Sequence, residues 1–373
     1  MSACSSAPSP FFSSGMACLM SLVGRSVPRG LRWAPEVAAP CLRPFARLQH
    51  AHFGSLSGTK AAVPLAHVVP RDGSRHDVKL LPSSPELLRL PVKSIARMSP
   101  GEEERLAYML DEHGAVVLQP QEAEAGEDDG TAVYDTLDRL FGSCVPHDAM
   151  NARGVVVINP AKPTSINTAD TAREHLPHTD DAYTENPAMF CTLQCRTAAP
   201  SGGGETVLIS GVELLAALSN QELKNLMRPG MVSMGRRPAA DASWLKVSNI
   251  PMFWVDQNSG WLQLRWRCQD GCVQDVHGEV ARAYAQMDEV ARGEVHQLVV
   301  ALAPGEVLVV DNRAVAHGRR PYEAGEARVM WRKNYQGDSE FCRRLRSGLC
   351  AAYSSMFDGV SSMFELPYQV PEP

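Results

Sequence analysis

The chain has 373 residues, 44% of which are hydrophobic, and a formal net charge of −6 at pH 7. This length is enough for a large buried core. The sequence has no run of about 18 apolar residues, so we expect no membrane span. It has no long basic run either, so nucleic acid is not an expected partner, and no pattern specifies an oligomeric state.

The first 60 residues differ in composition from the rest. They contain ten serines and five arginines, and their only acidic residue is Glu36. A Ser- and Arg-rich, acid-poor amino terminus is typical of an organelle transit peptide. We therefore predict that residues 1–60 are a disordered transit peptide that directs the protein to a mitochondrion or plastid. The alternative is a disordered tail without a targeting function, on a cytoplasmic protein.

Residues 61–373 are most simply read as one domain, and its elements follow in chain order. The Pro- and Ser-punctuated stretch 61–95 is expected to be extended. A helix is expected over Ser99–His113, because Ser99 and Glu102 form a capping-box pattern and an apolar face follows. The next expected elements are a buried strand, a second helix and another strand, which read "HGAVVLQ", "AVYDTLDRLFG" and "GVVVIN".

A long polar loop, residues 160–175, precedes the second half of the chain. It is either a lid, with Asn167 and Asp170 contacting a substrate, or an ordinary surface loop. After it come apolar runs separated by Gly/Pro turns, which predict an antiparallel barrel or sandwich. These runs read "AMFCTLQCR", "ETVLIS", "GWLQLRWRC", "HQLVVALAPGEVLVVDN" and "RVMWRKNY". One helical insertion, "VELLAALSNQELKNLM", interrupts them and contains a second capping-box pattern at Ser219 and Glu222.

The ten cysteines are scattered along the chain. Three residues separate the members of the Cys191/Cys195 and Cys268/Cys272 pairs, a wider gap than in the CxxC knuckles of structural zinc sites. Both pairs lie in apolar, strand-like text. We expect them to be reduced thiols that pack as small hydrophobic side chains.

The segment "EHLPHTDDAY", residues 174–183, contains two histidines and two aspartates. On a strand, His178 and Asp180 would point to the same face and could converge on one ion. His175 is out of phase with His178 and is expected in the preceding loop. Asp181 is expected to face away and to hydrogen-bond a turn. Most HxD tripeptides are surface or satisfied core residues, so this motif alone is weak.

A third metal ligand would have to come from a distant strand. His317 is the best candidate, because an apolar strand leads into the polar residues around it in "GEVLVVDNRAVAHGRRPYE". Two histidines and one carboxylate form the facial triad of non-haem Fe(II) oxygenases, which leaves coordination positions open.

Two arginines follow His317 on the next apolar strand. Arg328 is eleven residues after His317 and Arg332 is four residues further, so both point to one face of that strand. A guanidinium can grip a carboxylate in two places, although a salt bridge to an acidic side chain is the alternative. Ion pairing is also expected for Arg265 and Arg267. The "SGGGETV" stretch is either a plain hairpin or a turn that offers the Thr206 hydroxyl to a carboxylate.

Together these motifs resemble the taurine dioxygenase-like (TauD/TfdA) family of Fe(II)/2-oxoglutarate-dependent oxygenases. The resemblance rests on His178-x-Asp180, the "GGET" that ends in Thr206, the distal His317 and the two arginines, and it spans about residues 85–340. It implies a mainly β fold with flanking helices, built on a double-stranded β-helix, the jelly-roll of clavaminate synthase-like enzymes. It also implies iron bound by the two histidines and Asp180.

The resemblance implies a role for the remaining motif residues and a reaction. Arg328 would pair with the distal carboxylate of the co-substrate 2-oxoglutarate, Thr206 would assist, and Arg332 would lie near the co-substrate or bind an anionic substrate. The enzyme would use Fe(II), 2-oxoglutarate and O₂ to hydroxylate an unactivated C–H bond of a small polar or anionic metabolite, with release of succinate and CO₂. Asp180 favours hydroxylation over halogenation, whereas desaturation or ring closure would use the same residues.

Two other classes of protein compete with this reading. One is a non-catalytic jelly-roll binding protein with a vestigial or zinc-filled site, and the other is a cupin-type oxygenase without a co-substrate. Neither needs a carboxylate clamp at this distance from His317. Arg328 and Thr206 therefore favour the 2-oxoglutarate-dependent enzyme.

Overall fold

The structure is a computed structural model that describes residues 78–122, 131–159, 169, 171–236, 245–247, 249–268 and 272–351. The predicted transit peptide, residues 1–60, and the candidate lid residues Asn167 and Asp170 lie outside the described residues. Within the described ranges, no helix combines the length and apolar character that a membrane crossing needs.

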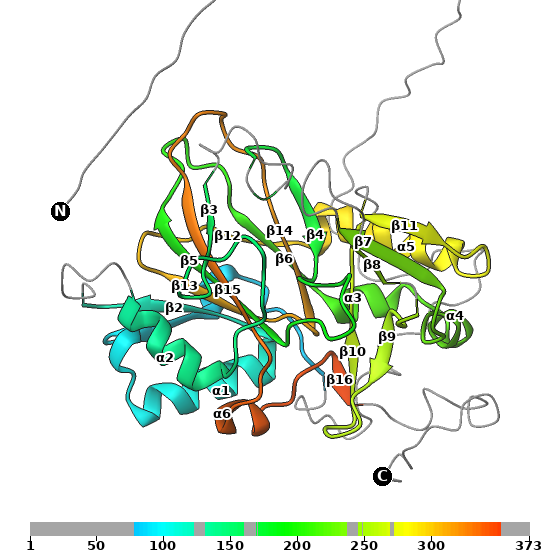
Figure 1. Ribbon diagram of the computed structural model, residues 1–373, viewed down its shortest axis with the longest axis horizontal. Helices are drawn as coiled ribbons and strands as arrows, with labels where there is room; N and C mark the ends of the chain where they lie inside the picture. Colours follow the sequence, from blue (N-terminus) through cyan, green and yellow to red (C-terminus); the bar gives the residue numbers. More distant parts are fainter. Residues whose placement is uncertain are drawn as a thin grey trace, which may run out of the picture. The chain divides into compact units, whose positions relative to one another are not determined.

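Two sheets form the centre of the structure (Figure 1). The larger has six strands in the order β1 (Arg89–Val92), β2 (Ala115–Pro120), β13 (Val307–Asp311), β5 (Phe190–Thr197), β15 (Val329–Tyr335) and β3 (Val156–Ile158). Its neighbours are antiparallel except β1 and β2. The smaller sheet has the order β12 (Leu298–Val300), β6 (Thr206–Ser210), β14 (Val315–Arg319) and β4 (His175–His178).

Successive strands alternate between these two sheets. The chain passes from β4 in the smaller sheet to β5 in the larger and back to β6, and it does so again from β12 through β13 and β14 to β15. This alternation is the double-stranded β-helix, so the predicted jelly-roll is confirmed. It also explains why the run "HQLVVALAPGEVLVVDN" forms two strands instead of one. The turn between them contains Gly305, whose φ is 92°, and it carries the chain across to the other sheet.

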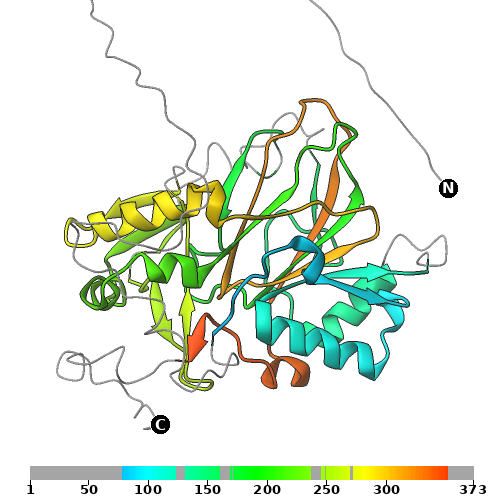
Figure 2. The same ribbon diagram turned by 180° about the vertical axis from the view of Figure 1, so that it is seen from behind.

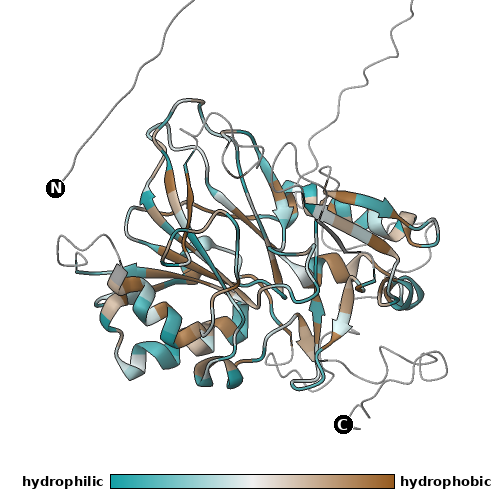
Figure 3. Ribbon diagram, in the orientation of Figure 1, coloured by the Kyte–Doolittle hydropathy of each residue, from teal (hydrophilic) through white to brown (hydrophobic). Residues whose placement is uncertain are grey.

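Strand β13 shows how the larger sheet is covered on both faces. All five of its residues are buried, and successive side chains point to opposite faces of a sheet. Leu308 and Val310 belong to the cluster between the two sheets, with residues of β6, β12 and β14. Val307 and Val309 belong to a cluster on the outer face. Figure 3 shows the corresponding hydrophobic stretches along the central strands.

Two helices cover the outer face of the larger sheet. They are α1 (Pro100–His113) and α2 (Thr131–Phe141), and their buried residues join the outer cluster. The predicted capping box of α1 is confirmed, because Ser99 and Glu102 bond to each other's main-chain N–H. Short 3₁₀ turns, Pro85–Leu88 and Ile95–Arg97, flank β1, and the helix α6 (Glu340–Arg343) packs on the same side.

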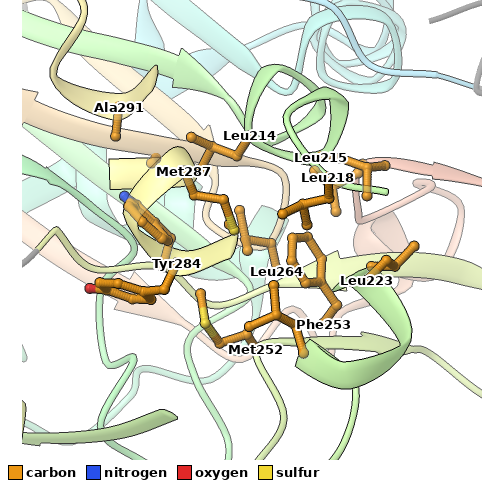
Figure 4. Packing of buried hydrophobic residues seen from close by; sticks show 14 of the residues in the cluster. Leu214, Leu215, Leu218, Leu223, Met252, Phe253, Leu264, Tyr284, Met287 and Ala291 are labelled. Atoms are coloured by element: carbon orange, nitrogen blue, oxygen red, sulfur yellow. The ribbon is translucent and has the colours of Figure 1, made fainter. Parts of the chain in front are cut away.

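A third hydrophobic cluster lies beside the jelly-roll, in the part of Figure 2 that is farther from α1 and α2. Figure 4 shows its side chains converging, with Phe253, Leu264 and Met287 among them. Its elements are α3 (Gly211–Ala216), α4 (Asn220–Leu226), α5 (Ala281–Arg292) and two three-stranded sheets. The first of these sheets has the strand order β16 (Cys350–Ala351), β10 (Trp261–Leu264) and β9 (Phe253–Val255). The second has the order β11 (Val273–Val276), β7 (Val232–Arg236) and β8 (Leu245–Val247).

The helical insertion predicted from "VELLAALSNQELKNLM" is confirmed, and it consists of two helices, α3 and α4. Ser219 caps the second of them in a complete capping box with Glu222, and a capping box starts a helix. The helix α5 was not predicted, although its buried residues have helical spacing. Cys191, Cys195 and Cys268 are free and buried, as expected for core thiols, whereas Cys272 is only partly buried.

Candidate active site

The two predicted metal-binding histidines face each other on neighbouring strands. His178 ends β4 and is the register partner of His317 on β14. Their ring centroids are 4.7 Å apart. Together with Asp180 they form a buried group whose candidate ligand atoms all lie within 4.8 Å of one another. The structure therefore brings together the three side chains that the sequence motif singles out.

Asp180 reaches this group by a different route from the predicted one. Strand β4 ends at His178, and Asp180 lies in the turn that follows. The next residue, Asp181, has a φ of 57° and is the one non-glycine residue in the described ranges with a positive φ. Aspartate tolerates this left-handed conformation better than most residues. A turn, and not the two-residue period of a strand, places the carboxylate near the histidines.

The carboxylate of Asp180 has several partners. Its Oδ1 accepts a hydrogen bond from Arg332 Nη1 at 3.0 Å, and its Oδ2 lies 3.9 Å from His317 Nε2. The Cys191 thiol is 3.4 Å from Oδ2. Burial by itself would raise the pKa of Asp180, but Arg332 and the two histidines hold it well below its usual value. The carboxylate is therefore anionic, as a metal ligand must be.

Both histidines can offer a lone pair to a cation. His178 Nδ1 lies 2.8 Å from the carbonyl oxygen of Leu176, which can only accept, so Nδ1 is the donor of this bond and Nε2 is the nitrogen available to a cation. Burial lowers the pKa of His317 to about 3, so this ring is neutral at pH 7. Two imidazoles and one carboxylate are a ligand set that suits Fe(II).

A pocket opens next to this group between the two sheets. Met330 and Arg332 line it from alternate positions of β15, and Arg328 lines it from the residue before that strand, so the prediction that both arginines lie on one strand is wrong. Thr206, the first residue of β6, lines it as well. The other lining residues are Ile158, Ala169, His175, His178, Leu193, His317, Gly318 and Arg319. Its charged walls are thus three arginines without a carboxylate among the described lining residues.

Arg328 is a buried cation whose partners are a main-chain carbonyl and an aromatic ring. Its Nη2 donates to the carbonyl oxygen of Gly204 at 3.0 Å, and its guanidinium lies 5.5 Å from the centre of the Tyr322 ring. In the described ranges no carboxylate lies within 4.0 Å of it, so the salt-bridge alternative fails for Arg328. Burial lowers its pKa, as expected for a charge without an anionic partner.

Gly204 has to be glycine to let Arg328 take this position. Its φ is 77°, and a Cβ atom there would lie 2.8 Å from Arg328 Nε and 2.9 Å from Arg328 Cδ. The three-glycine turn before Thr206 therefore does more than reverse the chain. It allows close approach between the turn and the arginine.

His175 does not lie in the preceding loop, and that prediction is wrong. It begins β4, its ring centroid is 4.0 Å from that of His178, and it lines the pocket. The pairing of β4 with β14 shifts in register between His317 and Arg319. This irregularity explains why two residues three apart stack on each other. Burial lowers the pKa of His175 well below its usual value, so the ring is neutral.

The expectation of ion pairing is wrong for Arg265. This side chain is fully buried and donates to the carbonyl oxygens of Pro251, Ala182, Val232 and Ile250. Ala182 belongs to the turn after Asp180. Arg265 therefore links this turn, through hydrogen bonds, to segments of the third hydrophobic cluster. The main chain of Arg267 pairs with that of His178 in an isolated antiparallel β-bridge.

A second polar group lies beyond Asp181. The Tyr183 hydroxyl donates to Asp181 Oδ1 at 3.2 Å and accepts from Arg236 Nη1 at 3.1 Å. Arg236 also contacts His147 Nε2 at 2.6 Å and pairs with Asp148. Asp181 accepts from Asn334 Nδ2 at 2.9 Å, so it holds two side chains. The sequence reading missed His147 and Arg236, because neither lies near a motif.

Comparison with known proteins shows the family to which this chain belongs. Residues 78–333 match the family "Taurine catabolism dioxygenase TauD, TfdA family". The chain belongs to the TauD/TfdA family. It is a 2-oxoglutarate-dependent dioxygenase that uses Fe(II), 2-oxoglutarate and O₂ to hydroxylate a small metabolite. The predicted enzyme class and co-substrates are thereby confirmed, and the non-catalytic alternative is disfavoured.

Individual relatives of this TauD/TfdA member are distant. It is 26% identical over 230 residues to a uridine-5'-phosphate dioxygenase from Amycolatopsis sp, which is 57% of this chain and 81% of that protein. It also shares its fold with an asparagine oxygenase solved with Fe(II), 3-hydroxyasparagine and succinate. The TM-score is 0.50 at 17% identity, over 70% of this chain and 93% of the other. The oxygenase OrfP, solved with Fe and alpha-ketoglutaric acid, also has this fold. Its TM-score is 0.50 at 18% sequence identity, over 69% of this chain and 88% of that chain.

Proposed function

We propose that His178, Asp180 and His317 hold the Fe(II) of this dioxygenase, and that Arg328 and Thr206 bind 2-oxoglutarate beside it. One observation carries the proposal. Arg328 is a buried guanidinium without a carboxylate partner in the described structure, and it lines the same pocket as His178 and His317. A buried cation is costly without an anion, and the carboxylate of a co-substrate would supply one.

The residues present fit the metal. The donor set is two imidazoles and one anionic carboxylate, all buried, with ligand atoms within 4.8 Å of one another. Such a set favours Fe(II) and leaves coordination positions for a co-substrate and O₂. When bound, Fe(II) and 2-oxoglutarate supply the oxidative decarboxylation in which one oxygen atom of O₂ enters succinate and the other the hydroxylated product.

The protein's own side chains contribute charge and orientation. Arg328 would pair with the carboxylate of 2-oxoglutarate that is distant from the metal, through a planar fork. Thr206 would offer its hydroxyl to the same carboxylate from the start of β6. Arg332 already pairs with Asp180 at 3.0 Å. Its proposed role is therefore to hold the metal-binding carboxylate and to present its other N–H groups to an anion in the pocket.

We further propose that the substrate is a small polar or anionic metabolite. The support is the charge of the pocket wall, which contains Arg319, Arg328 and Arg332 and no carboxylate among its described lining residues. Relatives of this chain have been named for uridine-5'-phosphate and asparagine, which both carry anionic groups. Nucleotides and amino acids are therefore the first two classes to test.

The direct test is succinate formation. The purified protein is incubated with Fe(II), ascorbate, 2-oxoglutarate and a panel of nucleoside monophosphates, amino acids and sulfonates. We expect substrate-stimulated release of succinate, and none with Asp180→Ala. Equal rates for the two proteins across the whole panel would refute the proposed site.

We also propose that residues 1–60 direct the protein to a mitochondrion or plastid. The support is the compositional contrast between ten serines and five arginines and the single acidic residue Glu36.

A further inference from the structure

One buried amide holds the main chain of Asp180. The backbone N–H of Asp180 donates to Asn312 Oδ1 at 2.7 Å, and Asn312 Nδ2 donates back to the carbonyl oxygen of Asp180 at 2.9 Å. The same Nδ2 donates to the carbonyl oxygen of Ala188 at 2.9 Å. Asn312 is 1% exposed, so these bonds are shielded from water.

This pairing replaces the one that a strand would have provided. Asp180 lies outside β4, and the chain turns sharply at Asp181. A residue there has no ladder neighbour for its N–H and C=O, and both groups need partners when buried. The Asn312 side chain satisfies both, in the way that a neighbouring strand satisfies a paired residue.

The position of Asn312 in the fold links it to the rest of the metal site. It stands in the turn between β13 and β14, five residues before His317. Its own N–H donates to the carbonyl oxygen of Met189 at 2.9 Å. The turn that leads into His317 is thus hydrogen-bonded, through Asn312, to the main chain of Asp180. From the other end of the same segment, Arg265 Nη1 donates to the carbonyl oxygen of Ala182 at 2.8 Å.

We propose that Asn312 is a positioning residue for the metal-binding carboxylate. It holds the main chain of Asp180 at a fixed distance from His178 and His317, so the three donors are arranged before the metal arrives. This inference rests on the proposed ligand set. It does not require Asn312 to touch the metal or the substrate.

The chemistry of the clamp requires a carboxamide. One end must accept from the Asp180 N–H, and the other must donate to two carbonyl oxygens. Aspartate has the same shape but no donor when ionised, and it would set an anion against two carbonyl oxygens. Alanine removes both the acceptor oxygen and the donor nitrogen of the amide. Asn312→Asp therefore tests the hydrogen bonds at constant volume, and Asn312→Ala tests them without an added charge.

The chain offers a matched control at Gln263. This amide is also fully buried, donates to the carbonyl oxygen of Ser347 at 3.2 Å, and accepts from Arg313 Nη1 at 3.0 Å. These partners lie outside residues 174–184. Gln263→Glu repeats the amide-to-acid change at a buried site whose hydrogen-bond partners are not the proposed metal ligands.

The experiment measures metal binding directly. Fe(II) under anaerobic conditions and Co(II) are titrated by calorimetry into the wild type, both Asn312 variants, Gln263→Glu and Asp180→Ala, and the Co(II) absorption spectrum reports the ligand geometry. We expect both Asn312 variants to bind about 10- to 100-fold more weakly, the usual range for partners of metal ligands. The Co(II) spectrum should change with them. Gln263→Glu should keep the wild-type affinity and spectrum.

The outcomes separate this inference from the proposed function. If Asp180→Ala binds Fe(II) as tightly as the wild type, the proposed ligand set is wrong. If Asp180→Ala loses binding while the folded Asn312 variants keep wild-type affinity and spectrum, the positioning role is wrong. Loss of folding in both Asn312 variants, with Gln263→Glu still folded, would also overturn it in favour of a purely structural role.

Discussion

Arg332 and Asp180 form a buried ion pair at the edge of the proposed metal site. Arg332 Nη1 lies 3.0 Å from Asp180 Oδ1, and the two side chains are 13% and 6% exposed. Burial by itself would lower the pKa of Arg332, but Asp180 and its neighbours raise it. The arginine that the motif associates with anions is thus already engaged by a metal ligand.

Arg332→Met should destabilise the metal-free protein. The substitution leaves Asp180 buried without its counter-charge, and breaking a buried pair costs about 3–5 kcal/mol. The free energy of unfolding, measured by urea denaturation without metal, should fall by that order. Arg139→Met is the comparison, because its pair with Glu103 is half-exposed at 55% and 19% and should contribute less than about 1 kcal/mol. Equal losses in both variants would contradict the importance of the buried pair.

Arg328→Gln should weaken co-substrate binding without harming the fold. A hydrogen bond to a charged group contributes about 1.5–3 kcal/mol, so the KM for 2-oxoglutarate should rise roughly 10- to 100-fold. The metal-free protein should be as stable as the wild type or more stable, because the change removes a buried charge that lacks an anionic partner in the described structure. Steady-state kinetics and thermal unfolding measure the two effects. An unchanged KM would exclude Arg328 from the co-substrate site.

Gly204→Ala should impair the co-substrate site through Arg328. The added Cβ would lie 2.8 Å from Arg328 Nε, so the guanidinium would have to move. Gly202→Ala is a close control, since Gly202 has a similar φ of 83° but a Cβ atom added there would have no neighbour within 4 Å. Both variants should lose about 1 kcal/mol of stability or more from backbone strain. Only Gly204→Ala should raise the KM for 2-oxoglutarate.

The metal-free protein should lose stability as the pH falls below 6.5. Burial, Arg332 and Arg236 lower the pKa of His147 from 6.5 to about 4, so between these values the unfolded chain binds a proton that the folded chain does not. The stability that the neutral ring contributes is complete above pH 6.5 and is lost progressively toward pH 4.

Urea denaturation between pH 4 and 7 measures this dependence. Each such histidine contributes a slope of up to about 1.4 kcal/mol per pH unit, and His317 acts in the same direction because its pKa is lowered to about 3. His147→Gln should reduce the slope of the unfolding free energy against pH by the contribution of one histidine. A slope identical to that of the wild type would show that His147 titrates normally in the folded protein.

The targeting prediction can be tested by fusion to a fluorescent protein. Residues 1–60 should carry the fluorescent protein into a mitochondrion or plastid, and the chain without them should stay in the cytoplasm. Organelle import of the shortened chain would contradict the prediction.

Local patterns predicted much of this fold because the forces behind them are local. The capping boxes at Ser99 and Ser219 mark helix starts through bonds within four residues. The side chains of Val307 to Val310 point alternately to the two faces of the sheet, because a strand is pleated. The same reasoning misplaced Asp180, because a strand period cannot reveal where a strand ends and a turn begins.

The sequence by itself determined which chemistry this protein can perform. The residues proposed for the site, His178, Asp180, His317, Thr206 and Arg328, were singled out by their types and by their order along the chain, which resemble the TauD/TfdA motif. Only the tertiary structure decided how Asp180 is held: Asn312 hydrogen-bonds its main chain across 132 residues of sequence, and Arg332 pairs with its carboxylate across 152. Contacts at such separations depend on which strands become neighbours, which no local pattern records.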